Sequence, residues 1–184
     1  MKTIEDLTHE HNAVIVALSL LEKIASAIDT GNTGAQKHLA DLLEFFEGFV
    51  DKCHHSKEED VLFPELERLG VARQGGPIGV MLSEHDAGRG HVRAIADNLK
   101  RLQAGDRAAA TQITQHANAY SEMLRAHIDK ENNVLFVMAA RLIPADVDER
   151  LAGQFDVIER ERVGEGKHEA YHALLHQLKD QYGV

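Results

Sequence analysis

The stretch His54-His55-Ser56-Lys57-Glu58-Glu59-Asp60-Val61-Leu62-Phe63 returns later in the chain as His127-Ile128-Asp129-Lys130-Glu131-Asn132-Asn133-Val134-Leu135-Phe136, with six of the ten positions identical. In each copy a glutamate follows the leading histidine by four residues. Residues i and i+4 of a helix lie on the same face, about 6 Å apart. The repeat therefore predicts two equivalent helices, each presenting one histidine and one glutamate side by side.

Two shorter matches extend this repeat to the helices that precede each copy. The pair Glu10-His11 matches Glu84-His85; His11 lies 43 residues before His54, and His85 lies 42 residues before His127. A helical hairpin used twice is typical of a pseudo-twofold bundle. We therefore predict an all-α fold: an antiparallel up-down four-helix bundle with two additional C-terminal helices.

Apolar periodicity and the glycine and proline positions set the expected boundaries. A capping box of Thr3 and Asp6 is expected to open the first helix. Residues 1–145 are expected to form the metal-binding bundle, and residues 146–184 a helical extension packed on the same domain, with a break at Gly164-Glu165-Gly166. The helices are predicted at about residues 4–30, 35–69, 77–104, 106–142, 146–160 and 168–181.

The repeated histidines are predicted to lie at one level of the bundle. His11 lies about 20 residues before the first interhelical turn and His54 about 20 after it, while His85 and His127 lie 20 and 22 residues from Gly105. With a rise of about 1.5 Å per residue and short turns, all four fall in one layer. A single histidine on a core face is usually a hydrogen-bonded core residue. Four in one layer, two of them paired with glutamate, indicate a metal site.

The candidate ligands are four imidazoles and two carboxylates: His11, His54, Glu58, His85, His127 and Glu131. Such a cluster would be costly in a core unless cations were coordinated there. Six donors are too many for one tetrahedral zinc ion, and a mixture of nitrogen and oxygen ligands suits iron or manganese. Two carboxylates on opposite helices can each bridge a metal pair. We therefore expect two adjacent metal ions with open positions for a small ligand.

These motifs resemble the hemerythrin-like, HHE cation-binding family. The resemblance covers about residues 4–142 and rests on His11, on His54-x-x-x-Glu58 followed by Leu62-Phe63-Pro64, on Glu84-His85, and on His127-x-x-x-Glu131 followed by Leu135-Phe136. It implies a non-haem di-iron site bridged by Glu58 and Glu131, with manganese or zinc as alternatives. It further implies that His11 and His54 serve one iron, and His85 and His127 the other.

Two departures from the family pattern bear on function. Oxygen-carrying hemerythrins have a second histidine one turn after the third-helix histidine, where this chain has Arg89, and their fourth-helix acid lies five residues after the histidine rather than four. A guanidinium is therefore expected to point at the site and stabilise anionic oxygen species. His55 is a candidate fifth nitrogen ligand, although it is rotated about 100° from His54 on a helix, which also fits an outer or surface role.

Composition excludes several other classes of protein. A net charge of −10 disfavours nucleic acid as a partner. No apolar run approaches the roughly 20 residues that span a bilayer, so no membrane association is expected. Acids at the N-terminus do not fit a signal peptide, and one cysteine, Cys53, fits a reducing compartment. These features favour a cytoplasmic protein and leave the oligomeric state open, with a homo-oligomer compatible.

One further motif lies near the C-terminus. His168-Glu169-Ala170-Tyr171-His172 matches the H-E-x-x-H signature of zinc peptidases. A peptidase needs a third ligand, and His176 lies about 12 Å along the same helix from His168, too far to share an ion. A polar stripe on a terminal helix or an accessory metal site explains the motif as well.

Three functional hypotheses follow. The first is a di-iron protein that binds or reacts with dioxygen, peroxide or nitric oxide in stress response or iron handling, with peroxidase-like, catalase-like or nitric-oxide-reactive turnover left open. The second is a metal-dependent sensor or regulatory module without turnover. The third is a zinc peptidase acting through Glu169.

Overall fold

The computed structural model describes residues 1–164 and 166–184, and Glu165 of the predicted break lies outside these described residues. Helices make up all of the regular structure there, and the described residues contain no β-strand, which confirms the predicted all-α class. The helical elements are α1 (Lys2–Asp29), α2 (Ala35–Phe45), η1 (Phe46–His55), η2 (Glu58–Leu62), α3 (Phe63–Arg68), α4 (Pro77–Gln103), α5 (Ala109–Lys130), η3 (Glu131–Leu135), α6 (Phe136–Leu142), α7 (Ala145–Ile158), η4 (Glu159–Val163) and α8 (Lys167–Tyr182).

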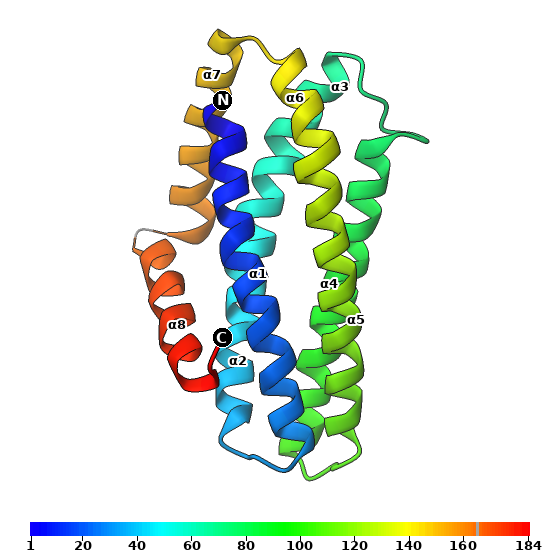
Figure 1. The fold of residues 1–184 in the computed structure, drawn as a ribbon, viewed down its shortest axis with the longest axis vertical. Helices are drawn as coiled ribbons and strands as arrows, with labels where there is room; N and C mark the ends of the chain where they lie inside the picture. The colour runs from blue at the N-terminus through cyan, green and yellow to red at the C-terminus, as the bar shows by residue number, and fades with distance from the viewer. Residues whose placement is uncertain (165) are drawn as a thin grey trace.

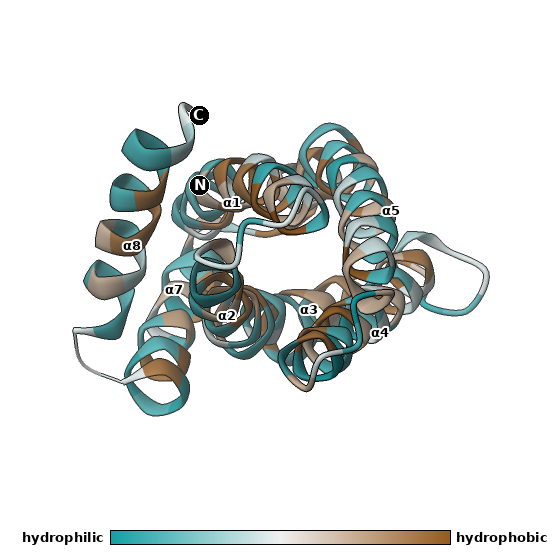
Figure 2. Cartoon of the chain, turned by 90° about the horizontal axis from the view of Figure 1, so that it is seen from below, coloured by the Kyte–Doolittle hydropathy of each residue, from teal (hydrophilic) through white to brown (hydrophobic). Residues whose placement is uncertain are grey.

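Four long helical stretches run side by side along the long axis of the molecule (Figure 1). The first stretch is α1, the second runs from α2 to α3, the third is α4, and the fourth runs from α5 to α6. Successive stretches run in opposite directions (Figure 1). Viewed from one end, α1, α2, α4 and α5 surround a common axis (Figure 2). On the ribbons of these helices, brown apolar residues lie mainly toward the common axis and teal polar residues mainly away from it, as expected of amphipathic helices (Figure 2).

The last two helices lie outside this group and pack on its first two stretches. α7 packs against α1 and η2, and α8 packs against α1 and α2 (Figure 2). Tyr171, Leu175 and Leu178 of α8 are buried against the main apolar cluster. The extension therefore covers one side of the group rather than extending it along the axis.

Two apolar clusters lie at different levels along the axis, and the predicted metal ligands lie between them. On α1, Leu7 belongs to one cluster and Val14 to the other, with His11 between them. On the second stretch, Val50 belongs to the same cluster as Val14, and Val61 belongs to the same cluster as Leu7. The ligand pair His54 and Glu58 lies between Val50 and Val61. The polar layer is thus closed at both ends by packed side chains, which exclude water.

The start of α1 differs from the prediction. The Thr3–Asp6 capping box is wrong, because α1 already begins at Lys2 and Thr3 lies inside its first turn. The free backbone amides of Lys2 and Thr3 donate instead to the carboxylate of Asp148 on α7, at 2.8 and 3.2 Å, and the Thr3 hydroxyl donates to the same carboxylate at 2.5 Å. A side chain 145 residues away therefore caps the first helix.

The composition of α1 also corrects a prediction. By length and composition α1 is apolar enough to cross a membrane, with a mean hydropathy of 1.4 over an 18-residue window, whereas the sequence was expected to hold no such segment. Inside the protein, 56% of that 18-residue segment is buried, and a helix in the core of a helical protein can be equally long and apolar. Leu18, Leu21 and Ile24 of α1 are fully buried in the main apolar cluster.

Candidate metal centre

The repeat found in the sequence has a counterpart in the backbone. Both copies depart from α-helical hydrogen bonding in a short π-helical segment, η2 and η3, and each segment begins on the glutamate of the repeat and ends on its leucine. π-helical turns are rare and occur frequently at functional sites. Glu58 and Glu131 therefore occupy equivalent positions in two equivalent local distortions, and both carboxylates are completely buried.

The four histidines come together as two pairs. The Nε2 atoms of His11 and His54 lie 3.1 Å apart, and those of His85 and His127 also lie 3.1 Å apart. Two imidazole nitrogens at this distance need either a proton or a cation between their lone pairs. Both pairs lie in the buried layer, with no ring more than 2% exposed.

The two glutamates connect the histidine pairs. One oxygen of Glu58 lies 3.7 Å from Nε2 of His54, and the other lies 3.4 Å from Nε2 of His85. Glu131 also contacts both pairs: one of its oxygens lies 3.2 Å from Nε2 of His11, and the other lies 3.2 Å from Nε2 of His127. Each carboxylate thus presents one oxygen to each histidine pair, as a bridging ligand does.

The chemistry of the donor set fits a pair of cations. Ligand atoms of His11, His54, Glu58 and Glu131 lie within 4.8 Å of one another, and so do those of Glu58, His85, His127 and Glu131. All four carboxylate oxygens of Glu58 and Glu131 are buried without a hydrogen-bond partner among the described residues. Buried unpaired carboxylates are costly, and metal coordination removes that cost.

The protonation states of the metal-free cluster follow from the same burial. Burial, and next the charge of Glu131, raises the pKa of Glu58 well above its ordinary value. Glu131 is buried to the same extent, but His127 and His11 hold the pKa of its carboxyl well below the ordinary value. Burial lowers the pKa of His54 to about 4, so that its imidazole is neutral and free to coordinate at neutral pH.

Each histidine is held from behind by an acceptor on its second ring nitrogen. His54 Nδ1 lies 2.8 Å from Glu10, His85 Nδ1 2.7 Å from Glu59, His127 Nδ1 2.8 Å from Glu84, and His11 Nδ1 2.9 Å from the side-chain oxygen of Asn132. When Nδ1–H donates to such an acceptor, the Nε2 lone pair faces the centre. None of these four acceptors was predicted to have a role, although two of them, Glu10 and Glu84, belong to the matched pairs Glu10-His11 and Glu84-His85.

Arg89 does not point into the site, contrary to the prediction. Its guanidinium donates to Asp51 at 2.7 Å, to Glu59 at 2.7 Å and to Asp86 at 3.0 Å, outside the histidine layer. The three carboxylates draw the guanidinium away from the buried centre. Arg89 thereby supports Glu59, the acceptor for His85, and the pKa of Glu59 falls to about 2 because its hydrogen bonds with His85 and Arg89 outweigh its burial.

His55 is buried beside the centre rather than exposed. Its ring stacks on that of His85 with centroids 3.8 Å apart, and its Nδ1 lies 3.4 Å from Asp51. Burial, and next the neighbouring His85, lowers the pKa of His55 to about 3, so the ring is neutral. His55 could also join Glu59 and His85 in a third group of ligand atoms. It lies outside both groups of four.

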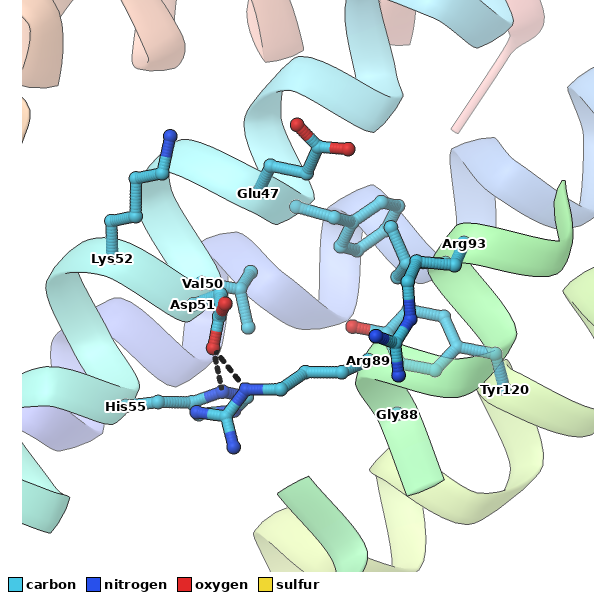
Figure 3. A pocket seen from close by; sticks show the side chains of 11 residues that line it. Glu47, Val50, Asp51, Lys52, His55, Gly88, Arg89, Arg93 and Tyr120 are labelled. Atoms are coloured by element: carbon cyan, nitrogen blue, oxygen red, sulfur yellow. Dashed lines mark hydrogen bonds and ion pairs between the residues drawn. The ribbon is translucent and has the colours of Figure 1, made fainter. Parts of the chain in front are cut away.

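A cavity of about 250 Å³ opens beside His55. Phe46, Val50 and Val92 form the apolar part of its lining, and the polar part consists of Glu47, Asp51, Lys52, His55, Arg89, Arg93 and Tyr120. Figure 3 shows Asp51 holding both His55 and Arg89 at one side of this cavity, with the Tyr120 hydroxyl directed into it. His55 separates the cavity from His85, so the cavity reaches within one ring of the centre.

The C-terminal histidines lie elsewhere. The rings of His168 and His172 lie 4.8 Å apart and both pack on Phe49, while Glu169 is exposed. Among the described residues, neither histidine belongs to a group of three or more ligand atoms close enough to share an ion. The motif therefore gains no third ligand from the fold.

Fold and site together define an all-helical protein with a candidate dinuclear histidine–glutamate metal centre. The chain matches the Hemerythrin HHE cation binding domain over residues 2–139, and it belongs to this family. This confirms the resemblance drawn from the repeat, and the description of the family as cation-binding agrees with the histidine and glutamate groups that could hold a metal.

Several relatives are similar over part or most of the chain. The iron-sulfur cluster repair protein YtfE of Edwardsiella ictaluri (strain 93-146) is 34% identical over 135 residues, which is 70% of this chain and 59% of that protein. YtfE of Salmonella typhimurium (strain LT2) is 41% identical over 90 residues, covering 47% of this chain and 40% of that protein. The uncharacterized protein Rv1995 of Mycobacterium tuberculosis is 22% identical over 180 residues, 98% of this chain and 70% of that protein.

The chain thus spans about three fifths or less of the two YtfE proteins that it matches. No solved structure gives a significant match to the chain.

Proposed function

We propose that this protein holds two iron ions in its central layer and uses them to bind or react with dioxygen, peroxide or nitric oxide, in stress response or iron handling. The observation that carries the proposal is the pair of buried glutamates, each with one oxygen at each histidine pair and no other partner in the described chain. Iron-sulfur cluster repair in the names of the YtfE relatives supports a role in iron handling.

The proposed ligands are His11 and His54 for one ion, His85 and His127 for the other, and Glu58 and Glu131 as bridges. The mixed donors suit iron or manganese better than zinc, and the names of the YtfE relatives favour iron, which would supply one-electron chemistry and open positions for small ligands. The four long stretches would then form the antiparallel four-helix bundle of the family over residues 1–145, with residues 146–184 packed on the same domain. We infer a cytoplasmic location from the single buried cysteine.

The chain's own residues would control access and geometry. The cavity beside His55 is the proposed approach for a small ligand, because its inner wall is the ring stacked on His85. Arg89 has a positioning role in this proposal: it fixes Glu59, and Glu59 orients His85. Packed side chains above and below the layer would keep other solutes away from the centre.

Metal analysis of the protein produced with iron tests the proposal. We expect two iron ions per chain and a near-ultraviolet absorption band, and the His54→Ala and Glu131→Ala variants should lose at least half of the metal. His176→Ala removes an exposed histidine outside the layer and should retain both ions. Less than one equivalent of any transition metal in the unmodified chain would contradict the proposal.

A sensor without turnover is the second candidate function, and the unpaired buried carboxylates favour it as well. They make folding stability depend on metal, which is what a metal-dependent switch needs. Steady-state consumption of peroxide by the iron-loaded protein separates the two candidates. Sustained turnover supports an enzyme, whereas a single stoichiometric reaction supports a sensor.

A further inference from the structure

The pseudo-twofold symmetry of the centre is broken in its outer contacts. The symmetry relates Lys57–Glu10–His54 to Lys130–Glu84–His127, and both sets form the same chain of contacts, from ammonium to carboxylate to imidazole. The other two histidines differ. His85 contacts the carboxylate of Glu59, whereas His11 contacts the neutral amide of Asn132 at the equivalent position.

The side chains around Glu59 are also more polar than those around Asn132. Arg89 lies one turn after His85 and holds Glu59, whereas the equivalent residue after His11 is Ile15. His55 stacks on His85, and its counterpart in the repeat is Ile128. The His85 side is therefore charged and polar at three positions where the His11 side is neutral or apolar.

This difference has a chemical consequence for metal binding. A carboxylate that accepts the Nδ1–H of an imidazole makes the Nε2 atom a stronger donor to a metal than a neutral amide does. His85 and His127 both have a carboxylate behind them, whereas of His11 and His54 only His54 has one. The bridging glutamates do not distinguish the positions, because each gives one oxygen to each side.

We propose that the two metal positions are unequal, with the His85–His127 position binding its ion more tightly and the His11–His54 position filling second and emptying first. Glu59 and Asn132 are the positioning residues that set this order. The inference rests on the proposed dinuclear function and adds to it: the ion beside the His55 cavity is the permanent one, and the ion on the far side is exchangeable.

Titration of the metal-free full chain with Co²⁺ under anaerobic conditions tests the order. We expect two resolved steps in calorimetry and visible absorption, with dissociation constants at least about tenfold apart. Crystals grown with one equivalent of Co²⁺ should show the anomalous signal at the cobalt edge mainly between His85 and His127. Equal signals at both positions, or a stronger one between His11 and His54, would overturn the inference.

Two variants assign the cause. Glu59→Gln places an amide behind His85, as behind His11, and should weaken the first step by about 10- to 100-fold and even out the anomalous signals. Asn132→Asp is isosteric and should tighten the second step, so the test remains decisive if the Glu59 variant folds poorly. Asp60→Asn and Asn133→Asp make the same charge changes one residue away, at exposed positions, and should shift neither step.

The failures of the two proposals are distinguishable. A chain that binds less than one equivalent of Co²⁺ contradicts the dinuclear function itself. Two bound ions with no preference, or a Glu59→Gln variant that weakens both steps equally, contradict only the inequality.

Discussion

The carboxylates of Glu58 and Glu131 meet in the central layer with all four oxygens buried and no hydrogen-bond partner in the described part of the chain. Their pKa values move in opposite directions: burial and the charge of Glu131 raise the pKa of Glu58, whereas His127 and His11 outweigh burial and lower the pKa of Glu131. The pair therefore destabilises the fold when no cation is bound and stabilises it once cations are coordinated.

Metal binding should stabilise the fold strongly. At an excess of about 100 times the dissociation constant, each occupied position adds about 2.7 kcal/mol to the free energy of unfolding. For a chain of this size, that is a rise in Tm of roughly 5–11 °C per position. Calorimetry with Fe²⁺ or Co²⁺ against a chelator measures it. Mg²⁺, which prefers oxygen ligands, should have little effect, and an unchanged Tm with Co²⁺ would contradict the prediction.

Lys57 and Lys130 are equivalent in the repeat but not in burial, and their substitution should show this. The Lys57 side chain is 4% exposed and pairs with the buried Glu10, whereas the Lys130 side chain is 39% exposed and pairs with Glu84. Lys57→Met leaves the buried Glu10 carboxylate without its ammonium counter-charge, with only the imidazole of His54 as a partner, and should cost about 3–5 kcal/mol. Lys130→Met should cost less than about 1 kcal/mol. Urea unfolding of the metal-free variants measures both, and similar losses would show that burial is not the cause.

The absence of a side chain at Gly48 allows α8 to pack closely against the second stretch. A Cβ atom at Gly48 would overlap with the hydroxyl of Tyr171 on α8, whereas one at Gly90 would meet nothing within 4 Å. Gly48→Ala should therefore loosen α8 and speed proteolysis within this helix. Gly90→Ala should instead stabilise the protein by about 0.5–1 kcal/mol, because alanine is favoured over glycine inside a helix. Equal protease resistance of the two variants would contradict the close approach of α8.

Asp148 should contribute stability that depends on pH. Burial alone would raise its pKa, but hydrogen bonds from Thr3 and Lys2 lower it below the ordinary value of 3.8. Its stabilising effect is thus present above about pH 4 and is lost as pH falls through the lowered folded-state pKa. Asp148→Ala should cost about 1–2 kcal/mol at pH 7, and the difference from the unmodified chain should shrink below pH 4.

Glu149→Ala serves as the control for Asp148, because Glu149 is exposed on the same helix. It should change the free energy of unfolding by less than about 0.5 kcal/mol at any pH. Chemical unfolding at pH 7 and pH 3 separates the two variants. A pH-independent loss for Asp148→Ala would show that packing rather than the charge matters there.

The helical class and the set of candidate ligands could be predicted from local patterns in the sequence. A repeated His-x-x-x-Glu on apolar stripes fixes both, since helix period and spacing are local properties that need no knowledge of neighbouring helices. The same reasoning failed for Arg89 and for the cap of α1. Arg89 faces away because Asp51 and Asp86 compete for its charge, and α1 is capped by Asp148, 145 residues from Thr3.

Which ligand and acceptor atoms come together depends on the packing of the helices. It placed one oxygen of each glutamate at each histidine pair, set Glu10, Glu59, Glu84 and Asn132 behind the four imidazoles, and stacked His55 on His85. These contacts join side chains on different helices, whose rotation and axial offset depend on packing of the whole core. The donors can therefore be read from the sequence, whereas their arrangement as two histidine pairs with different neighbours depends on the packing of the helices.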